Sequence, residues 1–272
     1  MRDNHAVTTP ENNNLALFCD FENIALGVRD AKYAKFDINK ILERLLVKGS
    51  IVVKKAYCDW GRYKDFKATM HEAAFELIDI PHVRQSGKNS ADIRMVVDAL
   101  DLCYTKSHVN TFVIISGDSD FSPLVSKLRE NAKTVIAVGV KNSTSDLLVS
   151  GCDEFIYYDD IVREDEQKRK PQPAKGRKQK PKPAAKEGDT MQEGIDLALE
   201  TAAALKGERG DQETLWGSMV KQALKRRRPG FNERYYGFDS FSSLLEEAQA
   251  RGLVDLELDE RSGGYIIREV RQ

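Results

Sequence analysis

The chain has no long apolar segment. None of its 272 residues belongs to a run of about 18 apolar side chains, the length that a membrane-spanning helix requires. The N-terminus also lacks the basic and then apolar pattern of a secretory signal. We therefore expect a cytoplasmic protein that has no membrane partner.

Cysteine and histidine are scarce, with four of each. The cysteines at 19, 58, 103 and 152 are widely spaced, lie beside apolar residues and form no C-x-x-C pair. This pattern argues against a disulfide framework and predicts buried thiols in a reducing cytosol. Neither a serine–histidine arrangement nor a nucleophilic cysteine beside a histidine is evident, so covalent nucleophilic catalysis is not expected.

Charge and proline are unevenly distributed along the chain. The net charge is −3 over residues 1–160, +5 over 161–190 and −3 over 191–272. The central segment also holds half of the eight prolines, at positions 171, 173, 181 and 183. Because it has almost no apolar side chain larger than alanine, it predicts an extended, flexible linker. Its basic residues would either add a weak hold on a phosphate backbone or simply keep a spacer hydrated.

The linker divides the chain into domains. Residues 1–14 are polar and predict a disordered N-terminus, and residues 15–160 predict the larger domain. The linker follows over 161–190, and a smaller domain over 191–272.

The larger domain shows strands that alternate with helices. Short apolar runs predict strands at 15–19, 51–57, 76–83, 111–116, 134–140 and 154–158. Helical patterns lie between them, one starting after Asp37 and stopping at Gly49, and another capped by Ser90. Such alternation predicts an α/β fold with a mostly parallel sheet and helices on both of its faces.

Four aspartates fall where these strands end. Asp20 ends the first strand, Asp118 and Asp120 follow the fourth, and Asp92 lies in the first turn of the helix after Ser90. Because the carboxyl ends of parallel strands share one edge of a sheet, the four carboxylates should converge. Converging carboxylates raise one another's proton affinity or bind Mg²⁺ or Mn²⁺. On a phosphodiester, such a site would activate water for in-line attack and stabilise the leaving oxygen.

Other polar residues are candidates for supporting roles. Asn23 and Ser116 can hydrogen-bond carboxylates or metal-bound water, or they form turns. Asp98 is six residues beyond Asp92, which places it about 120° around the helix and favours a supporting or structural role. Lys88, in the loop before Asp92, either contacts a phosphate or faces solvent.

Three motifs carry a resemblance to a known family. FCDFEN (18–23), KNSADIRMVVDAL (88–100) and SGDSDF (116–121), in this order, resemble the NYN domain, the PIN-like nuclease fold of the LabA-like group. The resemblance covers roughly residues 15–160 and implies a PIN-like α/β/α sandwich and a metal-dependent ribonuclease. It places the metal-binding acids of the family on Asp20, Asp92, Asp118 and Asp120, and Asn23 matches the polar partner after the first strand. Where family members often have Lys-Gly-Val-Asp, this chain has Asn-Ser-Ala-Asp at 89–92.

The C-terminal part shows helices followed by a hairpin. Helical spacing runs from Leu215 to Leu224 and again from Phe241 to Ala248, and strands are expected at 254–258 and 265–267. This order is typical of a winged helix. The string from Trp216 to Glu257 resembles the OST-HTH/LOTUS domain over about residues 210–270, which implies RNA or protein partners. A helix over 191–205 would lead into this domain or serve as an interaction helix.

A basic cluster ends the first of these helices. Its members are Lys225, Arg226, Arg227 and Arg228, with Arg234 and Tyr235 nearby. The cluster would either bind phosphates and stack on a base, or complement the helix dipole and stay hydrated.

Together these features predict a metal-dependent endoribonuclease acting on single-stranded or structured RNA, with a C-terminal module that binds RNA or protein. The alternative is a non-catalytic RNA-binding adaptor that keeps an acidic metal-binding site. A phosphatase is less favoured, because the Asp-x-Asp-x-Thr string is missing at the first strand.

Overall fold

The computed structural model describes residues 13–33, 36–80, 89–169, 185–209, 214–260 and 262–271. The chain divides into two compact units, Met1–Arg163 and Glu164–Gln272. Each unit has its own hydrophobic core. None of the helices in the described residues is long and apolar enough to cross a membrane.

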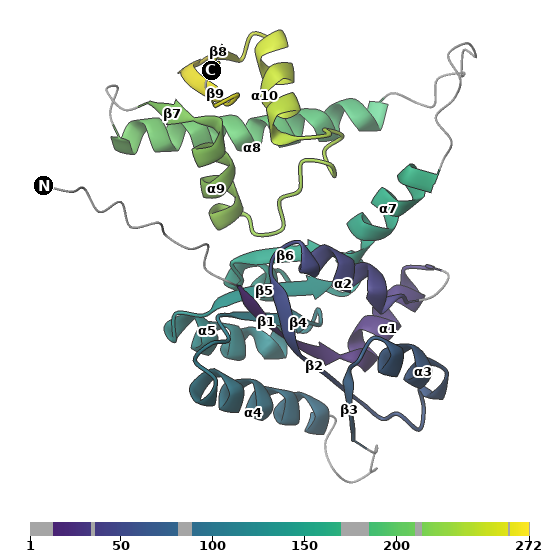
Figure 1. The fold of residues 1–272 in the computed structure, drawn as a ribbon. Coiled ribbons are helices and arrows are strands. Elements are labelled where there is room, and N and C mark those ends of the chain that lie inside the picture. The colour runs from purple at the N-terminus through teal and green to yellow at the C-terminus, as the bar shows by residue number, and fades with distance from the viewer. Residues whose placement is uncertain are drawn as a thin grey trace, which may run out of the picture. The chain divides into compact units, whose positions relative to one another are not determined.

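A six-stranded sheet forms the centre of the N-terminal unit (Figure 1). Its order is β3-β2-β1-β4-β5-β6, and every neighbouring pair is parallel. The strands are β1 (Asn14–Asp20), β2 (Ser50–Cys58), β3 (Glu76–Asp79), β4 (Thr111–Ile115), β5 (Thr134–Gly139) and β6 (Glu154–Tyr157). The parallel sheet predicted from the alternating pattern is therefore confirmed.

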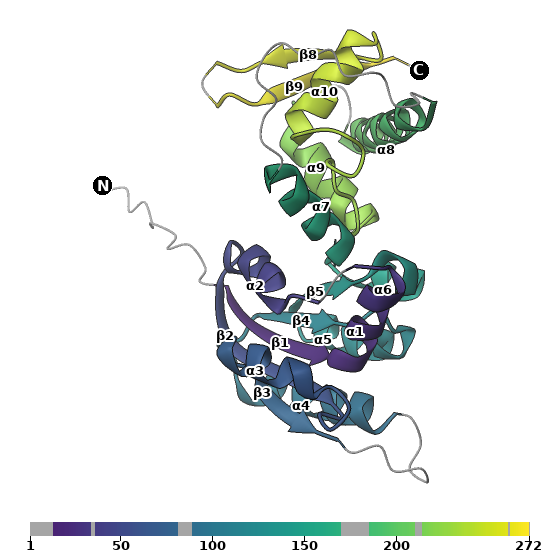
Figure 2. The same ribbon diagram turned by 90° about the vertical axis from the view of Figure 1, so that its right-hand side faces the viewer.

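Helices cover both faces of this sheet. One layer comprises α1 (Phe21–Asp30), α2 (Ile38–Leu46) and α3 (Lys64–Glu72), and the other α4 (Ser90–Thr105), α5 (Ser122–Glu130) and α6 (Asp146–Gly151). Alternate residues of β1 serve the two layers: Leu15 and Leu17 pack with the first, Ala16 and Phe18 with the second. The result is the α/β/α sandwich expected of a PIN-like fold (Figure 2). Two 3₁₀ turns, η1 (Ser119–Phe121) and η2 (Lys141–Ser143), and helix α7 (Tyr158–Arg169) complete the order.

The sequence pattern located some helix ends correctly and missed others. Asp37 caps α2 as predicted, with its carboxylate accepting from the backbone N–H of Asn39 at 3.0 Å. Ser90 does not cap α4; it is the first helical residue, and Asn89 occupies the cap position without a side-chain capping bond. Helices α1 and α6 were not predicted.

After α7, the described part of the C-terminal unit consists of helices packed with a small antiparallel sheet. The helices are α8 (Ala185–Arg209), α9 (Gly217–Arg227) and α10 (Phe241–Ala250), and the strands β7 (Leu215–Trp216), β8 (Val254–Leu258) and β9 (Tyr265–Val270) pair in the order β7-β9-β8. Ile195, Leu199 and Ala202 of α8 are buried in the core of this unit, which makes the helix predicted over 191–205 part of the domain. The predicted hairpin is present as β8 and β9.

Two other predictions, for Leu215 and Trp216 and for the linker, can be compared with the structure. Leu215 and Trp216 were expected in a helix, and this is wrong: both pair with β9, opposite Ile267 and Ile266, and this pairing outweighs the helical spacing. Of the linker predicted over 161–190, residues 161–169 belong to α7 and 185–190 to α8. Residues 1–12 and 170–184 lie outside the described residues, and so does the end of the third predicted strand at 81–83.

Candidate functional site

The sheet topology brings the predicted aspartates together. Strands β1 and β4 are hydrogen-bonded neighbours in the middle of the sheet, so Asp20 at the end of one lies near Asp118 just after the other. Asp92 reaches the same edge from the first turn of α4. The negative charges of Asp92 and Asp118 act on Asp20, and those of Asp118 and Asp120 act on Asp92. We call these four residues the acidic rim.

Asp20 is the most buried member of the acidic rim, with 8% of its surface exposed. Its carboxylate caps α1, since Oδ1 accepts a hydrogen bond from the backbone N–H of Asn23 at 3.3 Å. Its other oxygen, Oδ2, accepts from the hydroxyl of Ser116 at 3.0 Å. That hydroxyl in turn accepts from the backbone N–H of Asp118 at 3.2 Å. The predicted supporting residue Ser116 therefore links Asp20 to the turn that carries Asp118.

The side chain of Asn23 makes a second connection between the start of α1 and the turn after β4. Its side-chain oxygen accepts from the backbone N–H of Gly117 at 2.9 Å. Gly117 has no room for a side chain, because a Cβ there would lie 2.4 Å from the carbonyl oxygen of Ser143. The sequence Ser-Gly-Asp after β4 thus allows a close approach of backbones that a larger residue would prevent.

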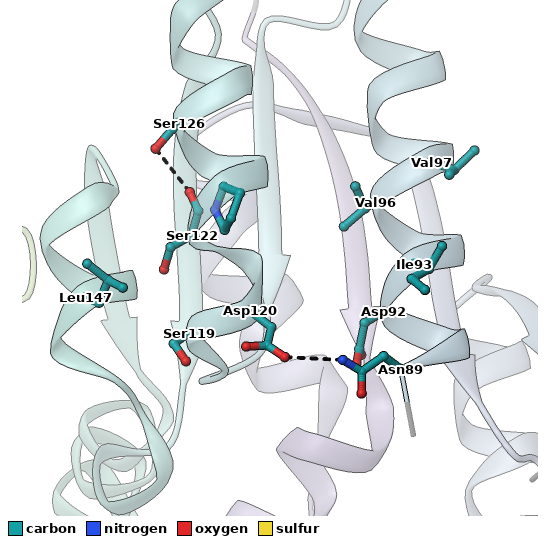
Figure 3. Close-up of a pocket in the computed structure, with 11 residues that line it drawn as sticks. Asn89, Asp92, Ile93, Val96, Val97, Ser119, Asp120, Ser122, Ser126 and Leu147 are labelled. Atoms are coloured by element: carbon teal, nitrogen blue, oxygen red, sulfur yellow. Dashed lines mark hydrogen bonds between the residues drawn. The ribbon is translucent and has the colours of Figure 1, made fainter. Parts of the chain in front are cut away.

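Asp118 and Asp120 share one turn of 3₁₀ helix. The carboxylate of Asp118 caps η1 and accepts from the backbone N–H of Asp120 at 3.0 Å. Asp120 is exposed, and its Oδ2 accepts from the side-chain amide of Asn89 at 3.5 Å (Figure 3). Asn89 lies just before α4, so this contact joins the start of α4 to the start of α5.

The surroundings of the acidic rim disfavour negative charge. Burial, followed by the charge of Asp92, raises the pKa of Asp20 to about 7 even though Asn23 and Ser116 hydrogen-bond its carboxylate. Burial, followed by the charges of Asp118 and Asp120, raises the pKa of Asp92 to about 6. For both carboxylates the largest influences are burial and neighbouring carboxylates, which favour the protonated form. A bound cation would favour the charged form instead.

Asp98 lies in a different environment on the same helix. Its carboxylate accepts hydrogen bonds from the Tyr57 hydroxyl at 2.9 Å, from Lys55 at 3.3 Å and from Arg94 at 3.0 Å. Burial alone would raise the pKa of Asp98, but these donors and the positive charges of Lys55 and Arg94 lower it below its usual value. Asp98 connects α4 to β2 and does not join the acidic rim.

The donor set of the acidic rim suits a hard divalent cation. Carboxylate oxygens are the preferred ligands of Mg²⁺, which usually takes one or two carboxylates and retains several waters. Neighbouring carboxylates raise the pKa of both Asp20 and Asp92, and a bound cation would offset this repulsion. As the side chains are placed, however, no three acidic, histidine or cysteine groups within the described residues are grouped closely enough to hold an ion. A bound ion would thus have to draw the carboxylates together or be completed by water.

The acidic rim opens onto a groove of about 740 Å³. Asp92 and Asp120 line it together with apolar residues of α4, α5 and α6, among them Ile93 and Leu147. Sequence reasoning missed these apolar residues, because they come from three helices whose proximity the pattern does not show. The sequence did offer one signal of the groove. Ile93 and Val97 are one helical turn apart in α4, so their side chains lie on the same face of that helix.

The predicted nucleic-acid contacts fall in separate places. Lys88 lies outside the described residues. Arg226, Arg227 and Arg228, at the end of α9, are exposed, whereas Lys225 is half-buried. Arg227 is ion-paired with Glu200 and donates to the hydroxyl of Thr201. Between α9 and α10, Arg234 is exposed and the half-buried Tyr235 packs edge-on against Tyr236.

Comparison with known proteins finds a family match that lies in the N-terminal unit. A family model described as the NYN domain matches residues 14–159. An uncharacterized protein of Methanocaldococcus jannaschii is 29% identical over 126 residues, which are 46% of this chain and 49% of that protein. The chain thus spans about half the length of this curated relative. The crystal structure of a protein of unknown function from Vibrio parahaemolyticus superposes with a TM-score of 0.50 and 26% identity, covering 56% of this chain and 97% of that one.

Proposed function

The chain belongs to the NYN domain family, and on this premise we propose that its N-terminal unit is a metal-dependent ribonuclease that cuts RNA internally. The reaction is hydrolysis of a phosphodiester bond. Mg²⁺ or Mn²⁺ is the proposed cofactor, bound at the acidic rim.

The observation that carries this proposal is the electrostatic state of the acidic rim. Asp20, Asp92 and Asp118 come from three separate elements. Burial and the charges of Asp92 and Asp118 raise the pKa of Asp20, and burial and the charges of Asp118 and Asp120 raise the pKa of Asp92. Such an arrangement destabilises the fold when no cation is present, so its presence in a compact core favours a functional role. A merely structural acid would be paired, as Asp98 is.

Each residue of the site has a role that follows from its contacts. Asp20, Asp92, Asp118 and Asp120 would hold the cation, which supplies an activated water and charge stabilisation for the leaving oxygen. Ser116 and the backbone N–H of Asn23 fix both oxygens of Asp20, so that its carboxylate cannot rotate away from its neighbours. The Asn23 side chain holds the backbone of Gly117 and with it the turn that carries Asp118.

For the C-terminal unit, we propose an OST-HTH/LOTUS-like module that selects the RNA or recruits a protein partner. Three helices followed by an antiparallel hairpin agree with the winged-helix arrangement of such a module. Exposed Arg226 and Arg228 at the end of α9 provide positive charge for a phosphate backbone.

A second candidate is a non-catalytic RNA-binding adaptor. The observation that favours it is the spacing of the acids, since no three of them are grouped to hold an ion within the described residues. In that case the acidic rim would bind a cation weakly or not at all. The two candidates differ in one measurable respect, which is whether RNA is cut.

We propose a cytoplasmic location for the protein. All four cysteines are buried and unpaired, which agrees with a reducing compartment.

The test is a cleavage assay with end-labelled RNA and DNA, with Mn²⁺, Mg²⁺ or EDTA. We expect wild-type protein to cut RNA only when a divalent cation is present. Asp118→Asn keeps an oxygen that can cap η1 but removes a negative charge, and should lower the cleavage rate by about 100-fold or more. Asp92→Asn should have a comparable effect.

The matched control is Asp101→Asn, which alters an exposed acid on the same helix as Asp92. This variant should cut at the wild-type rate. Equal cleavage by wild type and Asp118→Asn would mean that a contaminant cuts the RNA. No cleavage by the wild-type protein with either metal would favour the adaptor.

A further inference from the structure

The groove beside the acidic rim has walls from three helices. Ile93 and Val96 of α4 lie on one side, Leu147 of α6 lies on the other, and the start of α5 forms the floor between them (Figure 3). Asp92 and Asp120 stand at one end. A molecule held at the acids therefore continues directly into the groove.

Three of the apolar side chains that line the groove are exposed to solvent. Ile93 is 63% exposed, Val97 55% and Leu147 62%, whereas Met95 and Ala99 of α4 and Leu148 of α6 are buried in the core. Contiguous exposed apolar surface is unfavourable in water and marks a binding region. The groove volume of about 740 Å³ is within the range of roughly 300–1,000 Å³ typical of ligand pockets.

The described residues that line the groove suit one part of a nucleic acid better than another. No lysine or arginine is among them, so these residues provide no positive charge to a phosphate. An unpaired nucleobase has an apolar face and a polar edge, and such bases pack on apolar side chains while their edges form hydrogen bonds. Ile93 and Leu147 provide apolar contacts, and Asn89, Ser119 and Ser126 provide polar groups.

One hydroxyl of the groove adds to this fit. The buried Oγ of Ser122 has no hydrogen-bond partner within the described part of the chain. Ser122 lines the floor between the two apolar walls. A small opening of the groove by an inserted base would give this hydroxyl a partner on the base edge.

We propose that the groove is a nucleobase subsite, which holds an unpaired base of the RNA next to the phosphodiester bond at the acidic rim. This inference rests on the proposed ribonuclease function and narrows its substrate to single-stranded RNA, or to loops whose bases can turn outward. In a duplex the base faces are stacked and cannot enter.

The first experiment locates the base that enters the groove. A single-stranded oligoribonucleotide of one defined cleavage site is prepared with one abasic ribose at each position in turn. We expect removal of the base at one position beside the cut bond to slow cleavage by about fivefold or more, the lower end of what one base contact contributes. The same sequence annealed to its complement should resist cleavage.

The second experiment assigns that loss to the groove. Ile93→Ser and Leu147→Ser each remove apolar surface from one wall, and each should slow cleavage of the intact oligonucleotide while abolishing the abasic penalty. Leu46→Ser is the matched control, since Leu46 is 59% exposed at the end of α2, in the other helix layer. It should retain both the wild-type rate and the wild-type penalty. Circular dichroism checks that all three variants are folded.

The outcomes separate the subsite from the nuclease. If wild-type protein cuts RNA and Asp118→Asn does not, but Ile93→Ser and Leu147→Ser keep the abasic penalty, the subsite is wrong and the ribonuclease stands. If these two variants instead change the oligomeric state in light scattering, the groove is an interface between copies and the subsite is again wrong. If wild-type protein cuts no RNA, both proposals fail.

Discussion

Asp92 and Asp98 are six residues apart on one helix and have opposite electrostatic environments. Burial and the charges of Asp118 and Asp120 raise the pKa of Asp92, while Tyr57, Lys55 and Arg94 overcome burial and lower the pKa of Asp98. Residue type and helix are the same, so only the neighbours differ. Asp98 stabilises the fold through its hydrogen-bond and ion-pair partners, whereas Asp92 lies beside carboxylates that repel it.

The comparison separates structural from functional acids in this protein. Glu233 of the C-terminal unit behaves like Asp98: burial would raise its pKa, but a 2.7 Å contact from Lys221 lowers it. Asp20 behaves like Asp92. Paired acids hold elements together, and the unpaired ones at the edge of the sheet are available to a ligand.

The largest effect should appear in how stability depends on pH. The pKa of Asp20 is about 7 in the folded protein and about 3.9 in an unfolded chain. The folded state thus retains a proton that the unfolded state loses, so this stabilisation is complete below about pH 4 and is lost as pH rises through 7. Without metal, Asp20 should lower the free energy of unfolding by up to ~4 kcal/mol across that range.

Urea unfolding at pH 5 and pH 8 in EDTA measures this slope. Trp60 and Trp216 lie in different units, so a Trp216→Phe background makes fluorescence report the N-terminal unit. Asp20→Asn should flatten the pH dependence, and Mn²⁺ should stabilise wild type more than this variant at pH 8. If the stability of Asp20→Asn depends on pH as strongly as that of wild type, Asp20 is not the acid whose pKa is raised by burial.

The second effect tests the comparison directly. Asp98→Asn should lower the free energy of unfolding by about 2 kcal/mol, because Lys55 and Arg94 each lose an ion pair and the Tyr57 hydroxyl loses a charged acceptor. Asp92→Asn should leave the metal-free protein unchanged or more stable at pH 8, because a repelled charge is removed. The same fluorescence measurement serves both variants. If both shift stability in the same direction, the two environments are not opposite.

A smaller effect extends the comparison to the C-terminal unit. Glu233→Gln should lower the stability of that unit by about 1 kcal/mol, since the neutral side chain weakens the contact with Lys221. Fluorescence of Trp216 in a Trp60→Phe background follows the unfolding. A gain in stability would place Glu233 with the repelled acids instead.

The smallest effect concerns the basic end of α9. Arg226→Ala and Arg228→Ala should each weaken binding to single-stranded RNA a few-fold and reduce the salt dependence of log K by about 1 per phosphate contact. Arg227→Ala is the matched comparison, because Arg227 is paired with Glu200. Fluorescence anisotropy at several salt concentrations measures both quantities. If wild type and all three variants show equal salt slopes, the basic cluster does not bind phosphates. Its role would then be to complement the helix dipole.

Much of the fold could be predicted because its signals are local. Continuous apolar runs such as Thr111–Ile115 predict buried parallel strands, and β4 is buried at all five positions. The convergence of the acids also followed, since it depends only on strand direction. Helix α1 was missed because Asp20 ends a strand and caps a helix at the same residue, so the helix start resembled a turn.

Other features depend on contacts that no local pattern records. Leu215 and Trp216 form β7 only because β9, some fifty residues later, offers a pairing edge. Two of the partners of Asp98, Lys55 and Tyr57, come from β2, which is distant from Asp98 in the sequence. The groove likewise requires α4, α5 and α6 to be packed side by side before its apolar walls can be recognised.

Because β1 and β4 are neighbours in the sheet, residues that are far apart in the sequence meet at the acidic rim. The hydroxyl of Ser116 meets Asp20 although 96 residues separate them. The intervening chain leaves the sheet at β1 and returns to it at β4, so insertions or deletions in its loops would leave the pairing of β1 with β4 unchanged. Distant homologues should therefore be searched for by the order of the three acidic motifs, with the intervals between them left free.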